Sequence, residues 1–317
     1  MKRSLSILVL LFGMACSGHP NRAGTPKADT LVVYEAASLA GPMRAALDTF
    51  VRRSEGPVVV LEEHGASLEL ARKITELHRT PDVIALADQE VFPQLLIPGA
   101  TRWYAAFARN RMVIAYTPRS RHAAEITPDN WRTVLQRRDV LLGRTDPVLA
   151  PAGYRALLAY RLAEVFYHDT GLAARLEART PPTLMRGNAA ELAALLSAGE
   201  LDYIIDYESL ARAQHFPFVS LPPDVDLGDA DHTATYAEVS VRVRRGTDTV
   251  ELRGAPILYG VSLPRSAPHP VVAQRFLQFL LGPDGRAILR ASSVDALDQP
   301  MMRGDSIPAG LAAKTSP

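Results

Sequence analysis

The sequence predicts an α/β fold in two domains, and three observations support this. Short apolar segments alternate along the chain with amphipathic segments of helical period, which is typical of α/β proteins. A hydrophobic content of 47% is sufficient for sizeable cores. The roughly 290 residues that follow the N-terminal segment fit two domains of ordinary size.

The first 16 residues have the pattern of a secretory signal. Two basic residues precede an apolar run over residues 5–12, and small residues then lead to Cys16, the only cysteine of the chain. This run is shorter than the about 20 apolar residues of a transmembrane helix. Cys16 occupies the acylated position of a bacterial lipoprotein, although two residues before it depart from the usual pattern. We therefore expect an exported protein on the periplasmic face, anchored by a lipid on Cys16, with residues 17–30 as a flexible tether. Plain cleavage and an uncleaved anchor are the alternatives.

Two strand-turn-helix units follow the tether. In the first, residues 32–34 predict a short buried strand, and Ser38 precedes an amphipathic stripe. In the second, a strand over residues 58–62 leads through a glycine turn to Ser67 and a second amphipathic stripe. Each serine is predicted to be a helix N-cap, beside unpaired backbone N–H groups that favour an oxyanion. Capping without any ligand is the alternative for each serine.

The remaining elements continue the alternation. Strands are predicted at residues 82–86, 111–116, 141–143 and 257–263, and helices at residues 127–135, 154–167, around 192–196 and 272–280. The arginine clusters at residues 119–122, 137–138 and 242–245 are interpreted as solvated faces or turns. A formal net charge of +1 gives no electrostatic footprint for nucleic acid, so no nucleic-acid partner is expected.

Two blocks of this sequence resemble a known family. Tyr-Glu-Ala-Ala-Ser-Leu at residues 34–39 and the long block at residues 63–88 are similar to the periplasmic molybdate- and tungstate-binding proteins of ABC importers, and most of all to their tungstate-type branch. The resemblance covers about residues 31–300. It implies the two-lobed type II periplasmic binding protein fold, in which the chain crosses twice between lobes. We place the crossings near Thr117 and near residues 256–259. Lobe one is then 31–116 plus 259–300, lobe two is 117–258, and 301–317 form a C-terminal tail.

The resemblance also assigns donors to lobe two. Residues 146–153 are similar to the Asp-Pro…Pro-x-Gly loop of the family, in which the backbone N–H at the position of Ala152 donates to the anion. Asn188 and a glutamate three residues later predict a capping box variant, and the second backbone donor of the family falls at Ala189. Tyr207 takes the position whose phenol donates to the oxyanion. Core packing with the hydroxyl at the rim is the alternative for that tyrosine.

Two further positions bear on how the anion is coordinated. In the tungstate-type branch, carboxylates at the positions of Asp206 and Ala150 add oxygen ligands to the metal centre of the anion. An alanine cannot ligate, so we expect a tetrahedral anion held by neutral donors. Asp206 is then either a bystander bonded to the lobe-two backbone or a candidate additional ligand. A carboxylate beside a dianion is repulsive unless it ligates the metal or is protonated.

The sequence therefore predicts a monomeric solute-binding protein that captures molybdate or tungstate and delivers it to an ABC permease, without cofactor or covalent chemistry. A protein for another tetrahedral oxyanion, such as sulfate, is an alternative because sequence does not give cavity size. A hydrolase-like enzyme on a similar scaffold is another, for which Glu35 and His64 are the only nearby candidate bases. A sensor would need a helix-turn-helix or a spanning segment, and neither is visible. Dispersed histidines without HxxxH or Cys/His pairing predict no site for a free metal cation.

Overall fold

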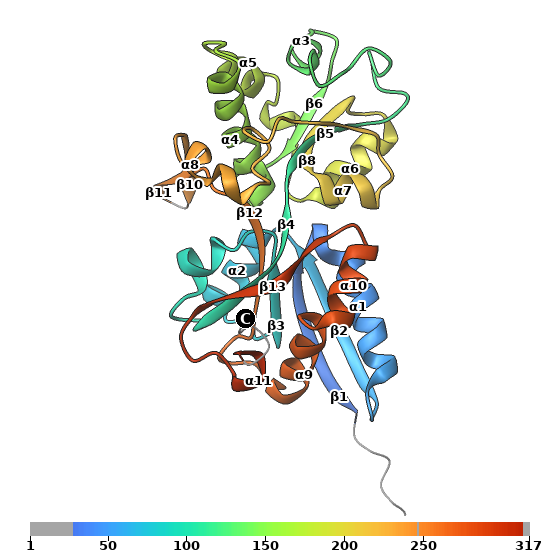
Figure 1. The fold of residues 1–317 in the computed structure, drawn as a ribbon, viewed down its shortest axis with the longest axis vertical. Coiled ribbons are helices and arrows are strands. Elements are labelled where there is room, and N and C mark those ends of the chain that lie inside the picture. The colour runs from blue at the N-terminus through green and yellow to red at the C-terminus, as the bar shows by residue number, and fades with distance from the viewer. Residues whose placement is uncertain (1–27, 246, 313–317) are drawn as a thin grey trace, which may run out of the picture.

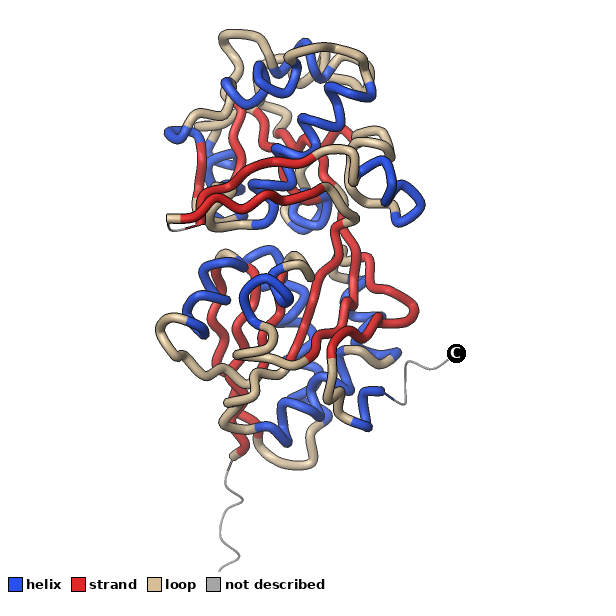
Figure 2. Tube along the Cα trace, turned by 90° about the vertical axis from the view of Figure 1, so that its left-hand side faces the viewer, coloured by secondary structure: helices blue, strands red, loops and turns tan. Residues whose placement is uncertain are grey.

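The chain folds into two lobes, each built on its own sheet with helices packed on it (Figure 1). The computed structural model describes residues 28–245 and 247–312. Figure 2 shows the strands that connect the lobes gathered at one side of the interface between them. The predicted α/β, two-lobed fold is confirmed.

Lobe one contains a six-stranded sheet of order β13-β4-β12-β3-β1-β2. Its strands are β1 (Asp29–Ala36), β2 (Val58–Gly65), β3 (Val83–Leu86), β4 (Trp103–Asn110), β12 (Ile257–Ser262) and β13 (Asp295–Gly304). Its helical segments are η1 (Ala37–Leu39), α1 (Ala40–Arg53), α2 (Ser67–Thr75), η2 (Phe92–Leu96), α9 (Pro270–Leu280), α10 (Pro283–Ala291) and α11 (Ala309–Ala312). Strand β1 runs parallel to β2 and β3, whereas β12 and β13 join in antiparallel pairs. Figure 1 shows α1, α9 and α10 on one side of this sheet and α2 on the other.

Lobe two contains a five-stranded sheet of order β7-β6-β8-β5-β9 and a hairpin of β10 and β11. Its strands are β5 (Met112–Tyr116), β6 (Leu142–Thr145), β7 (Met185–Arg186), β8 (Tyr203–Tyr207), β9 (Phe218–Ser220), β10 (Ser240–Arg245) and β11 (Asp248–Arg253). Its helical segments are α3 (Trp131–Leu135), α4 (Pro151–Phe166), α5 (Leu172–Ala178), η3 (Pro182–Leu184), α6 (Ala189–Ala198), α7 (Glu208–Ala213), η4 (Ala230–His232) and α8 (Thr233–Tyr236). Strand β6 is parallel to β7 and β8, and β5 is antiparallel to β8 and β9.

The sheets differ from the predicted lobe boundaries at two places. Residues 112–116, which the sequence placed in lobe one, pair with β8 and β9 of the second sheet. Strands β4 and β5 are separated by Arg111 alone, so no proline or glycine marks the crossing before Pro118. Strand β13 also extends to Gly304, past the predicted start of the tail.

Six strands were not predicted from the sequence: β4, β7, β9, β10, β11 and β13. The arginines at residues 242 and 244 lie on β10 and form a solvated face rather than a turn, because they are exposed and alternate with the buried Val241 and Val243. Within the described residues, no helix is both long enough and apolar enough to cross a membrane. Cys16 and the predicted signal lie outside the described residues.

Candidate functional site

A small cavity lies between the lobes, at the ends of strands from both sheets. Its volume is about 20 Å³, somewhat more than the roughly 10–15 Å³ that admits one water molecule. All six predicted ligand-contacting residues line it: Ser38, Ser67, Ala152, Ala189, Asp206 and Tyr207. The fold therefore brings together residues that are up to 169 positions apart in the sequence.

Lobe one contributes two serines from the turns that follow β1 and β2. Ser38 lies inside η1 and Ser67 is the first residue of α2. The N-cap positions are occupied by Ala36, Leu39 and Ala66, and none of them forms a side-chain cap. The prediction that each serine caps its helix was wrong, because η1 absorbs Ser38 and α2 begins one residue earlier than expected. Both hydroxyls are thereby released from capping.

Each serine hydroxyl instead forms a hydrogen bond with one group of lobe one. The backbone N–H of Ala87, which follows β3, donates to Ser67 Oγ at 3.0 Å, so the hydroxyl proton of Ser67 is left to donate to another acceptor. The hydroxyl of Ser38 is hydrogen-bonded to the phenol of Tyr259 on β12. Among the described residues, neither hydroxyl is hydrogen-bonded to a histidine or a carboxylate.

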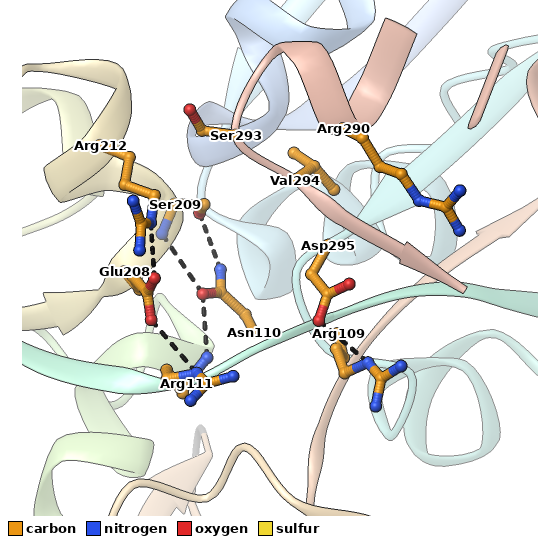
Figure 3. Close-up of a pocket in the computed structure, with 10 residues that line it drawn as sticks. All are labelled: Arg109, Asn110, Arg111, Glu208, Ser209, Arg212, Arg290, Ser293, Val294 and Asp295. Carbon is orange, nitrogen blue, oxygen red and sulfur yellow. Dashed lines mark hydrogen bonds and ion pairs between the residues drawn. The ribbon is translucent and has the colours of Figure 1, made fainter. Parts of the chain in front are cut away.

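Tyr259 connects Ser38 to the first crossing between the lobes. The amide Nδ2 of Asn110, the last residue of β4, donates to the Tyr259 phenol at 2.5 Å and to Ser209 Oγ at 2.7 Å. Figure 3 shows Asn110 bonded to Ser209 and to the backbone of Arg111, where the chain enters lobe two. Sequence reasoning missed Asn110, Ser209 and Tyr259, since their proximity arises from the pairing of β12 with β4 and from the position of α7 beside Asn110.

Lobe two contributes backbone N–H groups from the first turns of two helices. Ala152 is the second residue of α4 and Ala189 is the first residue of α6, positions whose N–H groups have no acceptor within the helix. Asn188 caps α6 as predicted, because its Oδ1 accepts the N–H of Glu191 at 3.0 Å. The Glu191 carboxylate in turn accepts the N–H of Gly187, which completes the capping box variant.

The glycine of the Pro-Ala-Gly sequence allows α4 to approach the end of β6. A Cβ atom on Gly153 would lie 2.5 Å from the carbonyl oxygen of Thr145 and 2.6 Å from the carbonyl carbon of Asp146. Any other residue would therefore push the helix away from the strand. Gly153 thus positions the start of α4, including Ala152, at the cavity.

Asp206 and Tyr207 end strand β8 and are almost completely buried. Asp206 Oδ1 accepts the N–H of Tyr207 at 2.7 Å, as expected for a carboxylate turned toward its own backbone. Its Oδ2 has no hydrogen-bond partner among the described residues, and burial raises the pKa of Asp206 to about 7. The Tyr207 phenol donates to the carbonyl of Ala87 at 3.3 Å, and burial holds its pKa well above the usual value, so it remains a donor.

A buried ion pair joins the two lobes beside the cavity. Asp88, which follows β3, accepts hydrogen bonds on Oδ2 from the Tyr154 phenol at 2.6 Å and from Arg155 Nη2 at 2.6 Å and Nε at 2.9 Å. The side chains of Asp88 and Arg155 are no more than 1% exposed. Arg155 also donates to the carbonyl of Ala255 at the second crossing. Sequence reasoning assigned no role to either residue, because the pair forms only when two segments 67 residues apart pack together.

The charge around the cavity suits a small anion. Among the described residues that line it there is no lysine, arginine or histidine, and Asp206 is the only carboxylate. The first turns of α2, α4 and α6 lie at the cavity and present the positive ends of their dipoles. The candidate bases Glu35 and His64 contact each other at 2.9 Å, whereas the serines bond to Ala87 and Tyr259. The arrangement supports binding by neutral donors, and neither candidate base contacts a serine hydroxyl in the part of the chain that the structure describes.

The chain is similar to known proteins over most of its length. The model of the family of bacterial extracellular solute-binding proteins matches residues 31–292. The molybdate/tungstate-binding protein WtpA of Thermococcus kodakarensis is 30% identical over 326 residues, which span 94% of this chain and 92% of the relative. An uncharacterized solute-binding protein of Petrotoga mobilis is 38% identical over 272 residues, spanning 85% of this chain and 84% of the relative.

Two solved structures share the fold. The periplasmic molybdate-binding protein of Azotobacter vinelandii aligns with a TM-score of 0.59 at 16% identity, over 85% of this chain and 100% of that one. The sulfate-binding protein SubI of Mycobacterium tuberculosis aligns with a TM-score of 0.60 at 14% identity, over 90% of both chains. At such identities these structures establish the architecture alone.

Proposed function

Because the chain belongs to the family of bacterial extracellular solute-binding proteins, we propose that it captures molybdate or tungstate and delivers the anion to the permease of an ABC transporter. Within this family the protein is a solute-binding protein and not an enzyme. The relative from Thermococcus kodakarensis, named for molybdate and tungstate, supports the choice of ligand.

One observation carries the proposal. Ser38 and Ser67 from lobe one meet the first turns of α4 and α6 from lobe two around a single small cavity. Hydroxyl and backbone N–H donors stabilise an oxyanion through charge-assisted hydrogen bonds, which are about twice as strong as neutral ones. Donors from two lobes also make the ligand stabilise the closed arrangement of the lobes, as a transport cycle requires.

We propose a tetrahedral geometry for the bound anion. Ala150 lines the cavity and offers no oxygen, so the second carboxylate needed to expand the coordination of the metal centre is missing. Asp206 is the single carboxylate at the cavity, and its Oδ1 is engaged with its own backbone. Sulfate is the second candidate, because a lining of neutral donors accommodates any tetrahedral dianion of suitable size.

Calorimetric titration of the purified protein with molybdate, tungstate, sulfate and phosphate tests the proposal. We expect molybdate or tungstate to bind with a Kd at or below about 1 μM, since several charge-assisted bonds in a closed cleft supply roughly 8 kcal/mol. Folded protein that gives no binding heat and no thermal shift with either anion would exclude the proposed ligands. Tighter binding of sulfate would assign the protein to that anion instead.

The proposed location is the periplasmic side of the membrane, with residues 1–16 as the signal, a lipid on Cys16 as the anchor and a monomer as the working unit. The proposed tether is residues 17–28, two residues shorter than expected from the sequence, because residues 29 and 30 belong to β1. Acyl chains contribute about 0.8 kcal/mol per buried CH₂, so several chains hold a protein firmly at a membrane. Cys16→Ser is expected to release the protein into the soluble exported fraction. If the serine variant stays with the membrane, an uncleaved signal anchor is indicated.

A further inference from the structure

Three potential metal ligands meet directly behind the anion cavity. The parallel register of β1 and β2 places Glu35 opposite His64, and the alternation along β2 puts Glu62 on the same face as His64. One ligand atom from each of the three side chains lies within 4.8 Å of the other two. His64 Nδ1 lies 2.9 Å from Glu35 Oε1. Spacing along the sequence did not predict this cluster, because it depends on the pairing of two strands.

The cluster holds buried carboxylate oxygens without satisfactory partners. The Glu35 side chain is fully buried, and neither of its oxygens accepts a hydrogen bond from the described residues. Oε1 of Glu62 is likewise buried and without a hydrogen bond. Buried polar groups are normally satisfied, so each such atom requires an explanation. Burial raises the pKa of Glu35 to about 9, and the neighbouring Glu62 carboxylate contributes a smaller part of this increase.

The surroundings orient the free ligand atoms and leave a route from solvent. Arg44 of α1 binds Glu62 Oε2 at 2.6 Å, so the partnerless Oε1 remains for the cluster. The His64 side chain is 38% exposed and forms the outer side of the cluster, where a metal ion can enter and a water molecule can complete the coordination. Fixing of a ligand by a second residue, as Arg44 does here, is the usual support of a protein metal site.

We propose that Glu35, Glu62 and His64 bind a zinc ion. One imidazole nitrogen and two carboxylate oxygens are a donor set of borderline metals such as zinc, whereas calcium and magnesium prefer oxygen ligands alone. Zinc bonds of about 2.0–2.2 Å place tetrahedral ligand atoms roughly 3.3 Å apart. His64 Nδ1 and Glu35 Oε1 are 2.9 Å apart and no ligand atom is more than 4.8 Å from the other two, so small rotations of the side chains give that geometry.

The position of this site ties it to the anion cavity. Glu35 immediately precedes Ala36 and His64 immediately precedes Gly65, and both of these neighbours line the cavity. Zinc binding would displace the proton of Glu35 and offset the negative charge that the two ionised carboxylates then place behind an anion. Zinc binding itself needs no anion, so the site can be tested independently of the proposed function.

Zinc titration of the purified, chelator-treated protein by calorimetry tests the site, with cobalt absorption as a second readout of coordination. We expect about one zinc ion per chain with a Kd at or below about 10 μM. Glu35→Gln and His64→Ala are each expected to weaken zinc binding at least about tenfold and to abolish the tetrahedral cobalt spectrum. Glu35→Gln replaces a repelled carboxyl with a neutral group of the same shape, so this variant is expected to remain folded.

Two matched controls separate this site from general surface binding. Glu63→Gln changes the neighbouring residue of β2, whose side chain lies on the other face and binds Lys73 at 2.8 Å. His122→Asn removes a histidine that contacts Glu125 and Asp139 at the surface. Both controls are expected to bind zinc like the unaltered protein. Absence of zinc binding, or equal affinity in the His64→Ala and unaltered proteins, would overturn the proposal and leave a carboxyl pair that shares a proton.

Discussion

Ser38 and Ser67 differ in what each loses when its hydroxyl is removed. We expect Ser38→Ala and Ser67→Ala each to weaken anion binding by about 1.5–3 kcal/mol, because each removes a donor to a charged acceptor. Ser67→Ala also leaves the buried N–H of Ala87 without its acceptor. For this variant alone we therefore also expect the free energy of unfolding to fall by about 1–3 kcal/mol. Titration calorimetry and chemical denaturation measure the two effects.

A serine outside the cavity serves as the control for this pair. Ser54 at the end of α1 donates to the carbonyl of Phe50 and does not line the cavity, so Ser54→Ala should leave the anion Kd unchanged. An unchanged anion Kd in Ser38→Ala or Ser67→Ala would reduce that serine to a structural role. The two serines are thus tested separately.

Asp206 makes anion binding dependent on pH. Its pKa in the folded protein is raised from 3.8 to about 7. The protonated carboxyl therefore contributes fully to the free energy of unfolding below about pH 4, and this contribution is lost as the pH rises through about 7. A dianion beside this group favours the protonated form, so affinity should fall as the pH rises from about 6 to about 8.5. Asp206→Asn should keep the affinity found at low pH and remove most of this dependence.

The same variant tests whether Asp206 ligates the metal centre. If its carboxylate is a ligand, Asp206→Asn will weaken molybdate and tungstate far more than sulfate, which does not expand its coordination. X-ray absorption of the bound anion gives an independent answer. About four short metal–oxygen distances are expected, and two additional longer ones would contradict the tetrahedral geometry.

The cavity residues could be predicted because they belong to short continuous motifs. Ser67 lies between a strand end and a helix, a pattern that is visible in the sequence, whereas Ala152 and Tyr207 were assigned through the resemblance of their segments to a known family. Asp88, Asn110 and Tyr259 could not be predicted, because their roles depend on contacts across 67, 99 and 149 residues. Such contacts are set by tertiary packing and leave no local pattern.

Helix α6 contributes a backbone donor that can be removed without removing the helix. Ala189 is its first residue, and Asn188 before it is extended, with φ −146° and ψ 169°. Proline is favoured at the first position of a helix and tolerates an extended residue before it. We expect Ala189→Pro to weaken anion binding by about 1.5–3 kcal/mol through loss of the N–H, with little change in thermal stability.

Ala189→Gly is the matched control, because it retains the N–H and adds no bulk to the cavity. Calorimetry should give this variant nearly the affinity of the unaltered protein. If Ala189→Pro and Ala189→Gly bind the anion equally well, the N–H of Ala189 is not a donor to the anion.

At the scale of elements, a strand or helix was predictable where its own residues carry a strong periodic or apolar pattern. Strands β3 and β12 and helix α9 fall within two residues of the predicted positions, at 83–86, 257–262 and 270–280, whereas α3 begins at residue 131, four residues later than predicted. Strand β10 was missed because its exposed arginines dominate its composition, while its two buried valines alternate over only three positions. The crossing at Arg111 was missed because β4 and β5 follow each other almost without interruption.

Buried polar interactions connect the two lobes. They join residues that are far apart in the sequence, so no local sequence pattern predicts them. Besides the Asp88–Arg155 pair, the N–H of Leu68 at the start of α2 donates to the carbonyl of Leu149 at 3.3 Å. Removing one partner of a buried ion pair costs about 3–5 kcal/mol when the other charge stays buried. Separation of the lobes would return the remaining charge to water and avoid this cost.

We therefore expect Asp88→Asn to open the protein rather than to unfold it. Asparagine keeps the shape of the side chain but leaves the Arg155 guanidinium buried without a countercharge, which favours separation of the lobes. Small-angle X-ray scattering without anion should give a larger radius of gyration than for the unaltered protein. The anion should restore the compact form with at least about tenfold weaker affinity, because part of its binding free energy then closes the lobes. Asp284→Asn breaks an ion pair with Arg53 inside lobe one and should change neither quantity. Equal radii and equal affinities for Asp88→Asn and the unaltered protein would mean that the ion pair does not control closure.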